Sequence, residues 1–382
     1  MNDITIDKTG WKKWRFDEFA QNISERVEPS QTDLDIYVGL EHIDPDTLHL
    51  SRHGHPSDVE GTKLRFYKGD IIFGRRRAYQ RKTALATTDG ICSAHAMVLR
   101  AKEDVVDPSF FPFLFHSKQF IDMAITISVG GLSPTINWKD ISKQEFLLPP
   151  KPEQKRLAEL LWAADEMIEK EKYLFKLIEK SYQINIFTLF NNQSEYCDLG
   201  SLCNIKSGFA FPLRFQGHKD LPIPFFKVSD MNHLANKYEM KVSENYVDEN
   251  ILNSLKGQIF SAGSLIFPKI GATIYTDKKR LLSIDSIVDN NIMVLVPNRN
   301  LLDPYYLYYF FNSFKLVDII NTGAVPTIST ETVRNIQIPK LSIEKQESIV
   351  RKLNSIVISM KHQERLVGKS QQLKQELINN IF

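Results

Sequence analysis

The loop that decides the fold is written twice in this chain: residues 130–138 read GGLSPTINW, and residues 322–330 read TGAVPTIST. The Pro-Thr-Ile at 134–136 matches the Pro-Thr-Ile at 326–328, 192 residues later. Each copy alone is ordinary loop chemistry, a glycine-containing turn followed by a proline and a Thr-Ile that predicts the start of a strand. Its repetition at so long a distance predicts two copies of one domain.

The match extends well beyond the loop in both directions. At the same offset of 192, Gln154 aligns with Gln346 and Phe190 with Phe382. Upstream, AMVLRAKEDVVDPSF (96–110) aligns with IMVLVPNRNLLDPYY (292–306) at an offset of 196, and GDIIFGRR (69–76) resembles GSLIFPKI (263–270). A repeat of about half the chain is far longer than a solenoid repeat, so the sequence is a tandem duplication of a domain with a connector.

Each copy ends in a segment with helical periodicity. Apolar residues recur at steps of three, four and seven along two stripes: Leu157, Leu161, Ala164, Ile168, Phe175, Ile178, Tyr182 and Leu189, then Ile349, Leu353, Ile356, Met360, Val367, Leu377 and Ile381. This spacing predicts a helix from Glu153 to Phe190, roughly 57 Å long at 1.5 Å per residue, and a second helix capped by Ser342. A single such stripe is typical of a core helix, but two in register favour an antiparallel coiled coil.

The heads themselves are predicted to be mixed α/β. DIYVGLEHI, GDIIFGRR and SAHAMVLRA are typical of short strands. PSFFPFLFHSKQFIDMAI and PYYLYYFFNSFKLVDII are helix candidates, each opened by an Asp-Pro pair at 107–108 or 303–304. The expected architecture is a pseudo-two-fold dumbbell with heads at residues 1–150 and 194–341 and helical regions at 151–193 and 342–382.

Composition limits the class of protein. The chain has 382 residues, 42% hydrophobic and 25% charged, which is typical of a soluble folded protein. No segment has the apolar length of a signal peptide or a membrane span, and three cysteines without a CxxC pattern favour a reduced, cytoplasmic setting. The net charge of +2 neither favours nor excludes a nucleic-acid partner, because binding needs a local basic face.

No convincing catalytic constellation is present in the sequence. DPYY at 303–306 lacks the second proline of the amino-group methyltransferase motif, and the other copy reads DPSF, so a helix start is the better interpretation. His42, His49, His53 and His55 crowd one segment, but without cysteines or a helical i, i+4 pair they indicate a polar surface loop rather than a zinc site. We therefore expect no metal site and no cofactor bound by this chain.

A basic loop with an aromatic residue follows the same strand in both copies. RRRAYQRK (75–82) has five basic residues in eight, in a first domain (1–148) whose 19 basic and 21 acidic residues give a net charge of −2. Such a run is usually a solvated loop, but a counterpart in the second copy favours contact with DNA phosphates and bases. The candidate DNA-binding residues are Arg75, Arg76, Arg77, Tyr79, Arg81 and Lys82 in the first head and Lys269, Tyr275, Lys278, Lys279 and Arg280 in the second.

These features together resemble the specificity subunit of type I restriction–modification systems. The resemblance rests on a globular domain that ends in a G-x-x-P-T-I loop, a following strand and an LPP…EQ segment before a long helix, all repeated once. AGSLIFPKIGATIYTDKKR and DNNIMVLVPN in the second copy are especially similar to the target-recognition domains of that family. The first copy departs from this pattern at GRRRAYQRK.

The resemblance implies a non-catalytic reader of double-stranded DNA. Each head would recognise one half of a bipartite asymmetric site, and the helices would set the spacer and dock two methyltransferase subunits. Endonuclease/translocase subunits would complete the complex, and S-adenosylmethionine, ATP and magnesium would belong to those partners. Thr135, Asn137 and Thr327 in the repeated loops become DNA or methyltransferase contacts, although a purely structural turn is an equal alternative.

Two other functions stay open at this point. The chain is also compatible with the specificity component of a related multisubunit enzyme that cuts on both sides of its site. From a different class, it is compatible with a two-headed scaffold that binds proteins through its helices. An autonomous metal-dependent nuclease is the weakest option.

Overall fold

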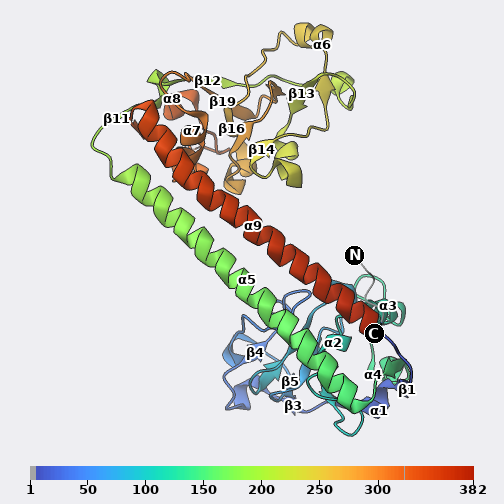
Figure 1. The fold of residues 1–382 in the computed structure, drawn as a ribbon. Coiled ribbons are helices and arrows are strands. Elements are labelled where there is room, and N and C mark those ends of the chain that lie inside the picture. Colours follow the sequence, from blue (N-terminus) through green and yellow to red (C-terminus); the bar gives the residue numbers. More distant parts are fainter. Residues whose placement is uncertain (1–5, 322) are drawn as a thin grey trace. The chain divides into compact units, whose positions relative to one another are not determined.

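The computed structural model describes residues 6–321 and 323–382, and its contacts divide the chain into two compact units. The first unit contains residues 1–173 and 364–382, and the second contains residues 174–363. Each unit therefore combines one globular head with part of both long helices (Figure 1). The units are described separately below, and the dumbbell arrangement of the heads stays a prediction.

The first head contains ten strands and several short helices among its described residues. The strands are β1 Lys12–Arg15, β2 Ala20–Ile23, β3 Arg26–Val27, β4 Tyr37–Val38, β5 Lys63–Phe66, β6 Ile71–Phe73, β7 Thr83–Leu85, β8 Gly90–Cys92, β9 Met97–Ala101 and β10 Glu145–Leu148. The α-helices are α1 Phe16–Phe19, α2 Phe111–Leu114, α3 Lys118–Thr126 and α4 Trp138–Ile141, and the 3-10 turns are η1 Pro29–Gln31, η2 Pro56–Asp58 and η3 Ala78–Gln80.

The second head has a similar set of elements. Its strands are β11 Tyr196–Asp198, β12 Cys203–Ser207, β13 Ile223–Phe226, β14 Glu239–Met240, β15 Tyr246–Val247, β16 Leu265–Pro268, β17 Arg280–Leu282, β18 Ile287–Val288, β19 Ile292–Pro297 and β20 Gln337–Pro339. Its helices are α6 Glu249–Ser254, α7 Pro304–Phe311 and α8 Thr330–Arg334, with 3-10 turns η4 Leu199–Ser201, η5 Leu213–Phe215, η6 Val228–Asn232, η7 Leu234–Asn236, η8 Gly271–Thr276 and η9 Leu316–Ile319.

Each head has its own main sheet, and the corresponding strands follow the same order in both, which confirms the duplication. The first head orders its strands β2-β9-β6-β7, and the second orders them β12-β19-β16-β17 with β14 added at the edge. The pairings within these four strands are antiparallel in both heads, with Ile71 opposite Leu85 in the first and Leu265 opposite Leu281 in the second. Each head also has a smaller sheet, β3-β5-β8-β4 or β15-β13-β18, that includes one parallel pairing. The mixed α/β class is therefore as expected.

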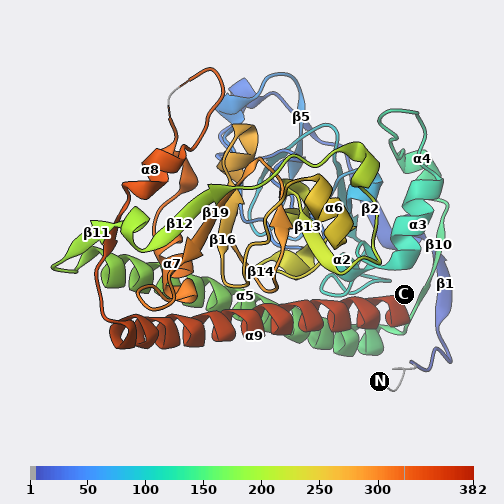
Figure 2. The same ribbon diagram turned by 90° about the horizontal axis from the view of Figure 1, so that it is seen from above.

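Each head has a core cluster without residues of the long helices, around Ile72 or Ile266, and another that lies between this sheet and the long helices. In the second unit, α7 fills this layer: Tyr306 and Phe310 belong to one buried cluster with Phe267 of the sheet and Phe190 and Leu353 of the long helices (Figure 2). Asp303 caps α7 as expected, because its carboxylate accepts hydrogen bonds from the backbone N–H groups of the first turn. Burial of these aromatic rings supplies much of the contact area that joins head and helices.

In the first unit, the single helix expected over PSFFPFLFHSKQFIDMAI is wrong. The structure has two helices, α2 and α3, and Asp107 does not begin either of them. Pro112 lies in the first turn of α2, where its missing N–H is tolerated and favours a helix that begins there rather than at Asp107. Ser117 starts a new helix because its hydroxyl accepts a hydrogen bond from the Phe120 N–H at 3.1 Å.

The long helices are α5, Lys151–Asn191, and α9, Ile343–Ile381. Within the first unit they run antiparallel, because Asp165 of α5 contacts Lys374 of α9, whereas Glu171, further along α5, accepts a hydrogen bond from the earlier Ser370 at 3.2 Å. In the second unit, the last turns of α5 and the first turns of α9 enter the same core cluster (Figure 1). The helix predictions are thus confirmed to within a few residues at each end.

A buried glutamine near the start of each long helix fastens it to its head. The Gln154 side chain accepts a hydrogen bond from the Asp107 N–H at 2.7 Å and donates to the carbonyls of residues 105 and 149 at 3.0 and 2.9 Å. Gln346 repeats all three bonds with the Asp303 N–H and the carbonyls of residues 301 and 341, each at 2.9 Å. Both side chains are 1% exposed, so no water replaces these bonds.

Gln154→Leu is therefore expected to destabilise the first unit by about 1–3 kcal/mol for each backbone group that stays unsatisfied. Hydrogen exchange, read separately over residues 1–173 and 174–363, is the measurement. Gln346→Leu is the matched control, and it should lower the protection against hydrogen exchange in the second unit and not in the first. Unchanged protection in the first unit of Gln154→Leu would show that the side chain is not a structural fastener.

Candidate nucleic-acid interface

The repeated Pro-Thr-Ile loop is hydrogen-bonded to the basic loop in both heads. In the first head, the Arg77 N–H donates to the Pro134 carbonyl at 2.7 Å and the Ile136 N–H donates to the Arg75 carbonyl at 3.0 Å. In the second head, the corresponding bonds run from the N–H of residue 271 to the carbonyl of residue 326 at 2.8 Å and from that of residue 328 to the carbonyl of residue 269 at 2.9 Å. Two features that were predicted independently thus form one site, once in each head.

Each Pro-Thr-Ile loop is itself a narrow hairpin. Val129 and Thr135 exchange both backbone hydrogen bonds at 3.0 Å, and the Asn321 N–H donates to the Thr327 carbonyl at 2.7 Å. Each threonine also forms a bridge to the basic loop, Thr135 to Arg76 and Thr327 to Ile270. The backbone of both threonines is therefore structural, whereas their side chains remain half-buried at the site.

The strand expected directly after each hairpin is wrong. A short helix comes first, α4 or α8, and only then β10 or β20. Ser329 explains this in the second head, because its hydroxyl accepts a hydrogen bond from the Thr332 N–H at 3.0 Å and caps α8. Asn137 occupies the same position before α4, and its side-chain amide lies 3.5 Å from Asp140 rather than capping the helix.

The first three arginines carry positive charge that the fold does not neutralise. Arg75 donates to the Ala94 carbonyl at 3.1 Å, Arg76 lies 3.2 Å from His95 Nε2, and Arg77 donates to the Ser133 hydroxyl at 3.1 Å. Over the described part of the chain, none of the three forms an ion pair with a carboxylate. Burial, and then the charges of Arg76 and Arg75, lower the pKa of His95, as expected in a positive local field.

Arg77 also has a backbone conformation that disfavours its side chain. Its φ is +58°, and the residue with the same hydrogen bond in the second head is Gly271, with a φ of +71°. A non-glycine residue in this left-handed region costs free energy, and such strain is concentrated at functional sites. Arg81 of the same loop has a φ of +55°, so the strain marks the backbone of this loop as a candidate functional segment and does not distinguish between the two guanidinium groups.

Arg81 and Lys82 of the same loop hold the head together instead. Arg81 pairs with Asp46 and donates to the His116 carbonyl at 3.3 Å and to Gln375 of α9 at 3.4 Å. Lys82 donates to the Leu40 carbonyl at 2.5 Å. Tyr79, between Arg77 and Arg81 in the sequence, has 52% of its surface exposed, so it is accessible to a ligand.

The basic residues of the second head are mostly committed to the fold. Lys279 is 2% exposed and bonds the Phe314 carbonyl at 2.6 Å and Asp277 at 2.9 Å. Arg280 donates to the Asn236 carbonyl at 2.7 Å, and burial lowers the pKa of both Lys279 and Arg280. This placement argues against direct DNA contacts by these two residues, because Lys279, directly before β17, is buried in the head and Arg280 is bonded to the Asn236 carbonyl.

The remaining candidates of the second head stay near its surface. Lys278 contacts Asn232, Lys269 donates to the Ser207 hydroxyl at 2.5 Å, and Tyr275 is 60% exposed. Lys269 and Lys278 are half-buried, and their only described partners here are neutral side chains. The second basic loop therefore exposes less positive charge than its number of lysine and arginine residues predicted.

The structure adds residues that the sequence did not single out. A cavity of about 250 Å³ beside Arg75 is lined by Arg26, Lys63, Asn22 and Trp138, among others, with no carboxylate in its lining. These side chains come from β2, β3, β5 and α4, of which only β3 and β5 share a sheet, so the packing of the whole head brings them together. No local motif in the sequence marks them.

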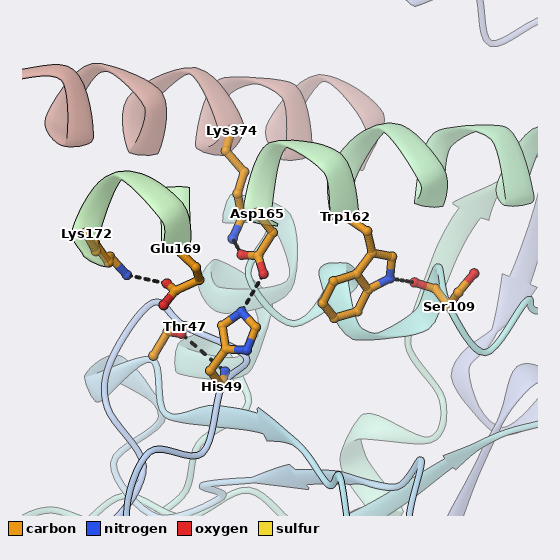
Figure 3. A network of polar contacts seen from close by, with 8 residues as sticks. All are labelled: Thr47, His49, Ser109, Trp162, Asp165, Glu169, Lys172 and Lys374. Atoms are coloured by element: carbon orange, nitrogen blue, oxygen red, sulfur yellow. Dashed lines mark hydrogen bonds and ion pairs between the residues drawn. The ribbon is translucent and has the colours of Figure 1, made fainter. Parts of the chain in front are cut away.

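A second polar site lies where the first head meets the helices. Lys374 of α9 and His49 of the head both contact the carboxylate of Asp165 of α5, the imidazole Nε2 at 2.6 Å (Figure 3). Burial would raise the pKa of Asp165, but the hydrogen bonds from His49 and Lys374 outweigh it and lower the pKa to about 2. The same bond to Asp165 raises the pKa of His49. His49 lies in an exposed loop, as expected, and its imidazole also joins this ionic cluster.

The matching place in the second unit is apolar. At the 192-residue offset, Tyr182 corresponds to Lys374 and Val357 to Asp165. The Tyr182 ring lies 6.3 Å from that of Tyr309, and Tyr182 is 9% exposed. The two heads are therefore attached to their helices by different physical interactions.

Comparison with known proteins identifies the family. A model of the type I restriction modification DNA specificity domain matches residues 57–180 and again residues 191–367. The two matches cover most of the chain, and the chain therefore belongs to this family of DNA specificity proteins. That role agrees with our expectation of a recognition chain rather than an enzyme.

Its similar relatives are specificity subunits of type I restriction enzymes. The EcoDI subunit of Escherichia coli is 32% identical over 166 residues, which cover 42% of this chain and 37% of that protein. The MjaIX subunit of Methanocaldococcus jannaschii is 22% identical over 276 residues, 67% of this chain and 62% of that protein. The matched segments thus span less than two thirds of the length of either relative.

Solved structures show the same fold at low sequence identity. A chain from a type I R-M system, studied for its complex assembly and conformational transition, has a TM-score of 0.65 at 17% identity, with 98% of this chain and 97% of that chain covered. The S subunit of a type I restriction-modification system from M. genitalium has a TM-score of 0.60 at 14% identity, with 100% and 97% covered. Across the described residues, no helix has both the length and the apolar character to cross a membrane.

Proposed function

We propose that this chain is a cytoplasmic, sequence-specific DNA-recognition subunit of a type I restriction–modification complex. Residues 1–150 and 194–341 are its two target-recognition domains, and each reads one half of a bipartite asymmetric site. The observation that carries the proposal is the twinned site, a basic loop hydrogen-bonded to a Pro-Thr-Ile hairpin at the same place in both heads. Two equivalent sites in one chain suit a target with two halves.

The helical regions, residues 151–193 and 342–382, set the spacer and dock two methyltransferase subunits in this proposal. Support comes from α5, which leaves a series of large apolar side chains exposed to solvent: Leu160, Met167, Tyr173, Leu174, Leu177, Ile184 and Phe187. Exposed apolar surface of this kind marks sites of protein interaction. Restriction subunits join the same complex, and S-adenosylmethionine, ATP and magnesium bind to the partners.

The contacts with DNA are assigned first to side chains that the fold leaves accessible. In the first head these are Arg75, Arg76, Arg77, Tyr79, Thr135 and Asn137, and in the second head Lys269, Tyr275, Lys278 and Thr327. Arg81, Lys82, Lys279 and Arg280 then act indirectly, because their bonds hold the basic loops in place. Flexible cationic side chains contribute chiefly by neutralising phosphates.

Replacing Arg75, Arg76 and Arg77 together by Ala is expected to weaken duplex binding and to flatten its salt dependence. Each lost phosphate contact lowers the slope of log K against log salt by about 0.9, so three contacts lower it by about 2.7. The measurement is a salt titration of duplex binding by the complex reconstituted with its methyltransferase.

Arg52→Ala is the matched control for this experiment. Arg52 is exposed on the same head but already pairs with Asp44, so its loss should leave the slope nearly unchanged. An unchanged slope in the triple variant would exclude phosphate contacts by this loop. If the wild-type complex bound no duplex at all, a protein-binding scaffold would become the better interpretation.

A further inference from the structure

The hairpin of the first head ends in an exposed apolar tip. Leu132 is 97% exposed and Val129, in the stem, is 65% exposed. The space around the preceding residue is also open, because a Cβ added at Gly131 would meet no atom within 4 Å. A leucine held almost entirely in water gains nothing from the fold, so its apolar surface is available to a partner.

The stem beneath this tip is fixed rather than loose. Thr135 and Val129 exchange two backbone hydrogen bonds, and the Arg77 N–H holds the Pro134 carbonyl at 2.7 Å. Arg77 Nη2 then donates to the hydroxyl of Ser133, the residue that follows Leu132, at 3.1 Å, which places a guanidinium on the hairpin next to its tip. The tip therefore combines a projecting apolar side chain with an adjacent positive charge that has no carboxylate partner among the described residues.

The second head repeats this combination in part. Its hairpin, closed by Asn321 and Thr327, presents Val325 with 55% of its surface exposed. The same basic loop carries Tyr275, and it bonds the Pro326 carbonyl through the Gly271 N–H. An apolar residue near the tip is thus a property of both hairpins rather than an accident of one loop.

We propose that Leu132 is a wedge that enters between two base pairs of the first half-site, with Arg77 on the adjoining phosphate, and that Val325 does the same in the second half-site. This inference rests on the proposed function and adds a mode of recognition to it. Apolar side chains next to arginine or lysine insert between base steps in many DNA-binding proteins, and the unstacking energy depends on the step. Insertion therefore adds sequence preference at one base-pair step, even where no side chain contacts the edges of its bases.

The test uses the full chain with its methyltransferase partner and duplexes that contain the methylated site. 2-Aminopurine is placed at each position of a half-site in turn, and its emission reports local unstacking. Wild type should raise the emission severalfold at one step, Leu132→Ser should return that step to the level of free duplex, and Leu132→Met should restore the rise. A rise at the adenine that becomes methylated is set aside, because it reports on the methyltransferase.

Two controls separate the possible failures. Leu213→Ser removes another leucine, 85% exposed and outside both hairpins, and should leave the signal unchanged. Tight binding with no unstacked step, or a rise unaffected by Leu132→Ser, overturns the wedge but leaves the proposed function intact. Failure of the wild-type complex to bind any duplex overturns the proposed function. Loss of methyltransferase assembly in Leu132→Ser, with the step signal retained, assigns the tip to a protein contact and also overturns the wedge.

Discussion

Deleting seven residues from the middle of both long helices, 171–177 of α5 and 362–368 of α9, is expected to shorten the spacer of the methylated site. A heptad deletion removes about 10 Å of helix and keeps the apolar stripe on the same face, because seven residues are close to two turns. At about 3.4 Å of rise per base pair, the two half-sites should come about three base pairs closer. The half-sites themselves should be unchanged, because the deletion does not alter either head.

The measurement is the genome-wide position of methylated adenines in cells that express the variant with its partner subunits. Deletion of the seven residues from α5 alone is the control, and it should abolish methylation because the two stripes no longer face each other in register. An unchanged spacer in the double deletion would contradict the role of the helices as a ruler, whatever its effect on the amount of methylation.

Replacing Lys374 by Met is expected to have the largest effect on stability. The side chains of Lys374 and Asp165 are 9% and 4% exposed, and removal of the lysine leaves a buried carboxylate with only His49 as a cationic partner. Breaking a buried ion pair from one side costs about 3–5 kcal/mol, because the remaining charge is desolvated without compensation. Hydrogen exchange and urea unfolding of the first unit measure this loss.

The second unit supplies a matched control for this experiment. Lys374→Tyr combined with Asp165→Val copies the residues at the corresponding positions there, Tyr182 and Val357, which belong to one apolar cluster. Because no charge is left unpaired, the double variant should recover most of the lost stability. A single variant as stable as wild type would show that the ionic cluster is not what attaches the first head to the helices.

Much of the fold follows from patterns that the sequence states directly. The repeated Pro-Thr-Ile and the offset of 192 that persists from this loop to the end of the chain revealed the duplication, and the seven-residue spacing of apolar side chains revealed α5 and α9. These signals are reliable because they are periodic and long, so that no single tertiary contact overrides them. Short segments were harder: Ser117 and Ser329 begin helices where one continuous helix and a strand were expected.

The structure places each basic loop beside its Pro-Thr-Ile hairpin, but the sequence did not show which basic side chains are accessible. Arg77 and Lys279 both belong to basic clusters in the sequence, yet one is exposed and the other is 2% exposed against Phe314. The sequence records the charge of a residue but not whether its side chain points into the head. Lys279 lies just before β17, so no alternation along a strand marks it as buried.

The sequence by itself determined the duplication, the mixed α/β heads, the two long helices and the family resemblance, because each depends on many residues in a repeated pattern. Only the tertiary structure decided which charges serve the fold and which remain available. Asp165 contacts His49 and Lys374 across 116 and 209 residues of sequence, and Arg77 reaches Ser133 in a separate loop. Such contacts depend on how distant segments pack and leave no local signal, since each residue type alone is compatible with an exposed loop.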